Sequence, residues 1–186
     1  MVGSGAHARR LHRRRQVTQR VFGITGWKNS GKTTLTERLV ATLTARGWRI
    51  STVKHAHHAF DIDQEGTDSF RHRQAGAGEV AIVSGKRWAL MHELHGEEEP
   101  KLETILARLS PCDLVLVEGY KRENHLKIEA RRRDARNGTP LSASDPHIVA
   151  IAADHPVEGE TIPVFDIDDV PAIADFIEST VGLRRS

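Results

Sequence analysis

Cysteine is almost absent from this chain of 186 residues, since Cys112 is the only one. A single thiol excludes an internal disulfide and a metal site built on several cysteines of one chain. Long apolar runs are absent too, because no stretch approaches the roughly 20 residues that a membrane-spanning helix needs. The basic residues near the N-terminus are not followed by the apolar stretch of a secretory signal. We therefore expect a cytoplasmic protein of one folded domain that does not use a membrane as a partner.

Acidic residues are missing from the first 20 positions, which hold six arginines. The remaining 21 basic and 25 acidic residues give the rest of the chain a net charge of −4, although the whole chain carries +2. A short charged arm with few apolar groups cannot form a core. We therefore expect residues 1–19 to be a basic, disordered leader. The alternative is an arm that contacts nucleic acid or an acidic partner, and nucleic acid is not the partner we expect.

One glycine-rich segment carries most of the functional information. Residues 26–33 fit the pattern G-x-x-x-x-G-K-[ST] of the phosphate-binding P-loop, and they lie between an apolar run and leucines at helical spacing. Gly26 and Gly31 would let backbone N–H groups approach the phosphates closely. Lys32 would reach the β- and γ-phosphates, and the Thr33 hydroxyl would bind Mg²⁺. We therefore expect residues 20–186 to form a P-loop nucleotide-binding domain.

Strand-like and helix-like segments alternate along this domain. The expected strands are 20–25, 49–54, 79–84, 113–118, 126–130, 148–152 and 162–166, and the expected helices are 32–46, 68–76, 100–109 and 170–180. Residues 86–94 add a further strand that would pair with 79–84 as a hairpin about Ser84 and Gly85. Such alternation predicts an α/β fold of three layers, a mostly parallel sheet with helices on both faces, as in P-loop NTPases.

A carboxylate follows the apolar strand candidate 113–118. In doubly wound sheets ligands gather at the carboxyl ends of the strands, and an acid at such an end can sit beside the metal of a P-loop. Glu118 is therefore the expected metal-associated carboxylate, the alternative being an ordinary strand-end acid. Asp113, at the other end of this strand, is expected to be a turn residue.

The loop 55–67 also starts at this edge of the sheet. Asp61 and Asp63 offer the oxygen ligands that Mg²⁺ prefers, and Lys54 could meet a phosphate. Asp68 is expected either to serve the site or to cap the following helix. The histidines in and after this loop, which include His55, His57, His58 and His72, permit a zinc or nickel site, but without nearby cysteines we favour a polar loop beside the phosphates.

Two later segments complete the expected site. Lys121 to Arg133 is rich in basic residues and would hold an anionic substrate or partner, unless it is a solvated charged hairpin. Asp154 follows the strand candidate 148–152, where a carboxylate could accept hydrogen bonds from guanine. No N-K-x-D motif is present, so these residues leave the choice between GTP and ATP open.

Taken together, these segments resemble the molybdopterin-guanine dinucleotide biosynthesis protein B (MobB) family. The resemblance covers residues 20–180 and is carried by the P-loop, by Val53 to Ser69, by Ala75 to Ala77, by Val117 to Lys121 and by Lys127 to Glu129. It implies a homodimer, with strand exchange near residues 79–94, that binds GTP with Mg²⁺ and hydrolyses it weakly. It also implies that the protein assists the guanylyltransferase that attaches GMP to molybdopterin, among other molybdopterin-handling proteins. By position, the nucleotide would be held by Gly26, Lys28, Asn29, Ser30, Gly31, Lys32, Thr33, Thr34 and Asp154, and the metal by Thr33, Glu118 and Asp63.

We expect at most a slow, Mg²⁺-dependent GTPase, because nothing in the sequence clearly supplies an arginine finger or a water-orienting glutamine. Asp63 or Asp68 would orient the water. Two other functions remain open. One is an ATP-dependent kinase or ligase acting on a small anionic substrate. The segment Val117-Glu118-Gly119 is similar to a pattern found in the ATP-dependent dethiobiotin synthetases. The other is a nickel-delivery GTPase that uses the histidines.

Overall fold

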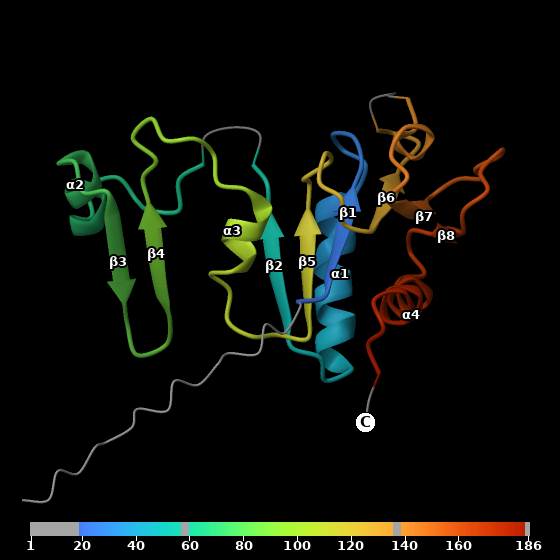
Figure 1. Cartoon of the computed structure of the whole chain (residues 1–186), viewed down its shortest axis with the longest axis horizontal. Coiled ribbons are helices and arrows are strands. Elements are labelled where there is room, and N and C mark those ends of the chain that lie inside the picture. The colour runs from blue at the N-terminus through green and yellow to red at the C-terminus, as the bar shows by residue number, and fades with distance from the viewer. Residues whose placement is uncertain (1–18, 57–59, 136–138, 185–186) are drawn as a thin grey trace, which may run out of the picture.

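The computed structural model describes residues 19–56, 60–135 and 139–184. Its main sheet has six parallel strands in the order β2-β5-β1-β6-β7-β8 (Figure 1). The strands are β1 (Val21–Thr25), β2 (Ile50–Lys54), β5 (Leu114–Glu118), β6 (Lys127–Arg131), β7 (Ile148–Ala153) and β8 (Val164–Asp166). Because all of them point the same way, their carboxyl ends form one edge, and β1, which leads into the glycine-rich segment, lies in the middle of that edge.

Alternating side chains explain why the sheet is covered on both faces. Leu114 and Leu116 of β5 join a buried cluster with α1 (Lys32–Ala45) and α4 (Val170–Thr180). Val115 and Val117 point to the other face and pack with Leu102 of the short helix α3 (Leu102–Leu106). A strand buried on both faces reads as a continuous apolar run, which is the pattern of parallel sheets. The three-layer α/β fold of P-loop NTPases predicted from the sequence is therefore confirmed.

A hairpin with its own helix lies beyond the β2 edge of the sheet (Figure 1). Strands β3 (Glu79–Val83) and β4 (Trp88–His92) pair antiparallel as a separate two-stranded sheet, and α2 (Asp68–Gln74) precedes them. The Ser84 backbone N–H donates to the Arg87 carbonyl at 2.9 Å and closes the turn. The predicted pairing of these two segments is confirmed, and the hairpin is not part of the main sheet.

Several predicted boundaries were too wide. The helix expected at 100–109 is regular only over Leu102–Leu106, and the strand expected at 162–166 is Val164–Asp166. Asp113 is a turn residue as expected, because its carboxylate accepts a hydrogen bond from the Arg49 backbone N–H at 2.7 Å. The predicted leader lies outside the described residues except for residue 19. No helix in the described part of the chain is long and apolar enough to cross a membrane.

Candidate nucleotide-binding site

Two glycines allow the loop after β1 to fold tightly. Gly26 has φ 145°, and a Cβ there would lie 2.4 Å from the Ser30 hydroxyl oxygen and 2.5 Å from the Ala130 carbonyl oxygen. Gly31 has φ 87°, and its Cβ would lie 2.6 Å from Arg132 Nε. Any other residue at either position would meet both a steric clash and an unfavourable backbone conformation. The loop therefore depends on the glycines that the motif specifies.

This loop leads directly into the N-terminus of α1. Gly31 is the residue before the helix, no side chain caps it, and the first turn contains no acid. Backbone N–H groups and the positive end of the helix dipole are therefore left to an anion. The Ser30 hydroxyl, only 1% exposed, makes no hydrogen bond to any residue that the structure describes. Such a cradle of donors fits the phosphates of a nucleotide.

Lys32 lies over the loop, where its ammonium group donates to the Trp27 carbonyl at 2.5 Å. Burial lowers the pKa of Lys32, and the charges of Lys121 and Lys54 lower it further, while Glu118 opposes them. The ammonium groups of Lys121 and Lys54 thus lie close enough to Lys32 to repel its charge. Their mutual repulsion would be relieved by a polyanion such as a triphosphate.

Glu118 and Thr33 are neighbours across the site, although 85 residues separate them in the chain. The Thr33 hydroxyl donates to Glu118 Oε1 at 2.8 Å, and Glu118 is buried at the end of β5, next to β1. A hydroxyl and a carboxylate are hard oxygen ligands, so the pair fits Mg²⁺. Lys54, which was expected to meet a phosphate, has its ammonium 3.4 Å from the same Glu118 oxygen.

The loop that contains Asp63 is held together by its own side chains. Asp63 Oδ1 accepts hydrogen bonds from Thr67 at 3.0 Å and from Ser69 at 2.9 Å. Arg73 packs beside it and binds Asp61 at 2.9 Å. Burial raises the pKa of Asp63, but the two hydroxyls, the Gln64 backbone N–H and the charge of Arg73 together outweigh burial, so the pKa lies below its usual value. The contacts of Asp63 among the described residues all lie within its own loop and α2, and none reaches Thr33 or Glu118.

The capping role considered for Asp68 was wrong. The residue that caps α2 is Thr67, whose hydroxyl accepts a hydrogen bond from the Phe70 N–H at 3.3 Å. Thr67 has the extended backbone of an N-cap, whereas Asp68 already lies in the first turn with its side chain exposed. An acid in the first turn still complements the helix dipole. Sequence reasoning missed Arg73, whose spacing from Asp61 and Asp63 only becomes meaningful once the loop is folded.

The histidine-rich loop is only partly visible, because His57 and His58 lie outside the described residues. His55 lies at 2.7 Å from Glu99, and its ring packs against Tyr120 with 4.8 Å between the centroids. Within the described ranges, no three His, Cys, Asp or Glu side chains are grouped so that they could hold a metal ion. The described residues therefore offer no support for a nickel or zinc site.

Asp154 lies at the carboxyl edge of the sheet, directly after β7. Its Oδ1 accepts hydrogen bonds from the Arg133 N–H at 2.9 Å and from the His155 ring at 2.8 Å. The His155 hydrogen bond, opposed by desolvation and supported by Arg133, keeps the pKa of Asp154 below its usual value. Asp154 thereby fixes the segment whose neighbour, Arg132, lies against Gly31.

Part of the basic segment cannot bind a substrate, contrary to the sequence prediction. Lys127 is fully buried, and its ammonium group contacts Asp145 at 2.6 Å and the Glu123 carbonyl at 2.6 Å. Arg131 binds Glu129 at 2.7 Å and Glu160 at 2.8 Å. These side chains lie on a face of β6 that later segments cover, which the sequence pattern did not reveal.

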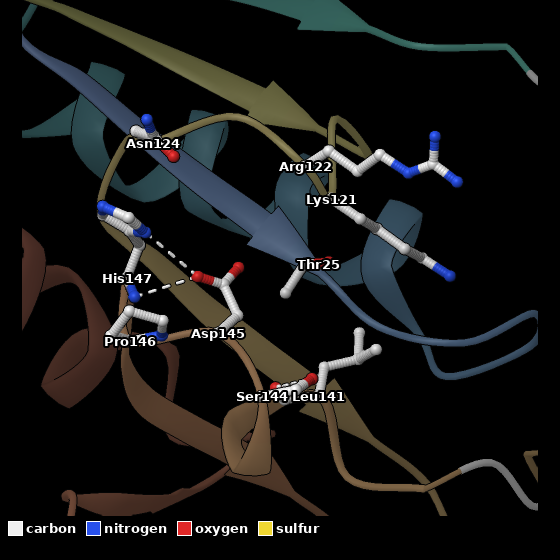
Figure 2. A pocket seen from close by; sticks show the side chains of 9 residues that line it. All are labelled: Thr25, Lys121, Arg122, Asn124, Leu141, Ser144, Asp145, Pro146 and His147. Carbon is white, nitrogen blue, oxygen red and sulfur yellow. Dashed lines mark hydrogen bonds and ion pairs between the residues drawn. The ribbon is translucent and has the colours of Figure 1, made fainter.

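Lys121 and Arg122 remain accessible beside a cavity of about 450 Å³. Figure 2 shows both side chains extending to the same side from the loop between β5 and β6, with Thr25 at the end of β1 nearby. The Lys121 ammonium also lies 4.1 Å from the centre of the Trp27 ring. The aromatic side chain inside the P-loop thus connects this cavity with the expected phosphate site.

Comparison with known proteins agrees with this geometry. The family model described as molybdopterin guanine dinucleotide synthesis protein B (MobB) matches residues 21–154. The chain is 40% identical over 159 residues to the molybdopterin-guanine dinucleotide biosynthesis adapter protein of Escherichia coli, covering 84% of this chain and 90% of that protein. It is 41% identical over 162 residues to the adapter protein of Haemophilus influenzae, covering 86% and 88%. A crystal structure of a MobB protein homolog from Bacillus stearothermophilus superposes with a TM-score of 0.65 at 32% identity, covering 88% of this chain and 99% of that one.

Proposed function

Because this chain belongs to the MobB family, whose members serve molybdopterin guanine dinucleotide synthesis, we propose that it is a GTP-binding adapter of that pathway with weak GTPase activity. It would assist a guanylyltransferase that attaches GMP to molybdopterin, in contact with the proteins that handle molybdopterin. The proposed setting is the cytoplasm, where a chain with one cysteine stays reduced.

The observation that carries this proposal is the Thr33–Glu118 pair at the mouth of the glycine loop. Its 2.8 Å hydrogen bond joins the expected metal-binding hydroxyl to the expected metal-associated acid. The P-loop backbone and Lys32 would hold the β- and γ-phosphates, with the exposed residues Lys28 and Asn29 of the loop and Thr34 of α1 beside them. Bound Mg²⁺ would neutralise charge on the phosphates. Asp154 is the proposed acceptor for guanine.

Slow hydrolysis follows from the state of the candidate water-orienting acids. Asp63 is engaged by Thr67 and Ser69, so it offers little basicity to a water molecule. Asp68 is exposed on α2. Because one of these two acids is engaged and the other is exposed, the site would orient water poorly, and a partner protein would have to complete it.

Support for a homodimer comes from the hairpin. Val83, Trp88 and Leu90 are exposed by 76%, 70% and 44%, and cross-strand pairing puts all three on the same face. An isolated two-stranded sheet is marginally stable in water, and an exposed apolar face of this kind marks an interaction site. We propose that a second copy of the chain covers this face.

Equilibrium titration of GTP and ATP, each with and without Mg²⁺, tests the nucleotide proposal, with tryptophan fluorescence in a Trp48→Phe, Trp88→Phe background as the readout of Trp27. We expect a Mg²⁺-dependent preference for GTP. Lys32→Ala should weaken binding about 100-fold, because charge-assisted hydrogen bonds to phosphates contribute about 1.5–3 kcal/mol each.

Lys86→Ala is the matched control, since it removes an exposed lysine of the β3–β4 turn, outside the site, and should change affinity little. Unchanged GTP affinity in Lys32→Ala would contradict the proposal. Preference for ATP, with turnover that depends on a small anionic substrate, would instead establish the kinase or ligase alternative.

A further inference from the structure

We propose that the cavity between the β5–β6 and β6–β7 connections is a second ligand site, which takes a small organic molecule bearing a phosphate monoester. This site adjoins the P-loop, because Thr25 directly precedes the loop and Lys121 contacts its Trp27, but the proposal does not require that GTP binds. It is lined by the start of the basic segment, of which Lys121 also faces the P-loop, and by the connection between β6 and β7.

The cavity has fixed walls. One wall is formed by residues 121–124 and the other by residues 141–147, with Thr25 between them at the end of β1 (Figure 2). The buried Lys127 ammonium ties the two walls together, because it contacts the carbonyls of Lys121 and Glu123 on one side and the Asp145 carboxylate on the other. A site whose walls share one buried ammonium group is largely formed before any ligand binds.

Its polar groups suit an anion. The Thr25 hydroxyl is 1% exposed and makes no hydrogen bond within the described ranges, yet Thr25 lines the cavity. A buried hydroxyl without a partner costs free energy that a ligand atom could recover. Lys121 and Arg122 supply two positive charges, whereas the one acid in the lining, Asp145, is paired with Lys127 at 2.6 Å. The balance of charge at the cavity therefore favours a negatively charged ligand.

The size of the cavity argues for more than a bare phosphate ion. About 450 Å³ lies within the range of roughly 300–1,000 Å³ typical of small-molecule sites. Leu141 and Pro146 add apolar surface to the lining. An arginine and a lysine bind phosphate oxygens, and the apolar side would accept the organic body of the ester.

Lys121 would couple this site to the P-loop. Its ammonium lies over the Trp27 ring, and Trp27 Nε1 donates to the Thr139 carbonyl at 2.9 Å, at the start of the second wall. A phosphate that draws Lys121 toward the cavity would change the surroundings of Trp27. In a Trp48→Phe, Trp88→Phe background, Trp27 fluorescence would therefore report occupation of the cavity.

The test titrates phenyl phosphate into the full-length Lys32→Ala protein, whose P-loop should no longer compete for phosphate, and follows heat and Trp27 fluorescence. We expect saturable binding of one molecule per chain, with inorganic phosphate and the uncharged phenol each binding at least tenfold more weakly. GMP is titrated in parallel. If GMP binds as tightly as phenyl phosphate, the site accepts a nucleotide phosphate; if GMP binds more weakly, the apolar side fits the organic body of another phosphate monoester.

Arg122→Gln should weaken phenyl phosphate about tenfold, and Thr25→Val should weaken it by a similar factor while Thr25→Ser retains binding. Arg133→Gln, which removes an exposed arginine after β6, is the matched control and should have no effect. Absence of saturable binding, or binding that is equal in Arg122→Gln and Arg133→Gln, would overturn the proposal. Failure of GTP to bind the unmodified protein would overturn only the proposed nucleotide function, since this titration does not use GTP.

Discussion

Glu118 carries a buried charge at the proposed nucleotide site, where it lies beside both Thr33 and Lys54. Glu118→Gln keeps an oxygen acceptor for the Thr33 hydroxyl but removes the negative charge. We expect the gain in GTP affinity on adding Mg²⁺ to fall about tenfold, equivalent to roughly 1.4 kcal/mol. Titration of GTP at several Mg²⁺ concentrations measures it.

Glu103→Gln, an exposed acid of α3, is the control for a change of net charge alone. Without Mg²⁺, GTP should bind Glu118→Gln at least as well as the unmodified protein, because one negative charge near the phosphates is gone. An unaltered response to Mg²⁺ would exclude Glu118 as the metal-associated acid.

His125 packs on Gly23 of β1, where both of its ring nitrogens are buried and neither has a hydrogen-bond partner among the described residues. Burial, together with the nearby charge of Lys127, lowers the pKa of His125 from 6.5 to about 4. The unfolded chain therefore takes up this proton more readily, so the free energy of unfolding is highest above pH 6.5 and falls as the pH drops toward 4. His125→Leu should flatten this fall, as measured by urea unfolding at pH 7.5, 6 and 5.

His92 is the control for this experiment, because the Glu79 carboxylate raises its pKa above 6.5. Its contribution has the opposite sign: it is complete below pH 6.5 and is lost as the pH rises through the folded-state pKa. His92→Gln should therefore make the loss of stability in acid steeper. An identical pH profile in His125→Leu and the unmodified protein would refute the role given to His125.

For single residues, the sequence predicted the positions that belong to a motif, but it missed contacts that form only when distant segments fold together. Thr33 and Glu118 could be paired in advance, because each ends or follows a strand at the same edge of a parallel sheet. The burial of Lys127 could not, since its partner Asp145 arrives from a connection with no recognisable pattern. Asp63 was likewise assigned to the metal because the hydroxyls that bind it, Thr67 and Ser69, look like ordinary loop residues.

Among the elements, the hairpin of β3 and β4 makes the clearest prediction. Replacing Val83 and Trp88 together with lysine should leave the fold intact, because both side chains are already exposed. The proposed dimer should dissociate at concentrations at least about 100-fold higher than before, since each of the two copies would lose a buried tryptophan, and one such residue at the centre of an interface typically contributes about 2 kcal/mol or more. Sedimentation velocity over a concentration series measures the change.

Lys86→Gln, in the turn of the same hairpin, changes charge without touching the apolar face and should dimerise normally. A dimer that survives the double replacement would mean that another surface joins the two chains. The pairing of these strands was predictable from their composition, but their separation from the main sheet was not, because nothing local in the sequence distinguishes an added hairpin from two more strands of the sheet.

Over the whole molecule, the main core draws its members from Phe22 to Leu183. Deleting residues 1–18 should therefore change neither GTP affinity nor the melting temperature, since the deleted arm is rich in arginine and poor in core-forming residues. Calorimetric melting and GTP titration of the two lengths side by side test this. A drop in melting temperature of more than a few degrees would show that the arm packs against the domain.

The alternation of strands and helices predicted the layered architecture because a parallel sheet leaves few other ways to bury both faces. The order of the strands and the paths of their connections could not be predicted from the sequence. These connections form the walls of the cavity.

Lys127 has a consequence for the order in which the molecule opens and closes. Its ammonium group loses its water only when the connections on both sides of β6 are in place, so docking either one early would leave a dehydrated charge with part of its ligands. The two connections should therefore exchange their amide hydrogens as one cooperative unit, distinct from the slower strands beneath them. The two connections around the cavity would therefore be the last segments at this edge of the sheet to fold and the first to unfold.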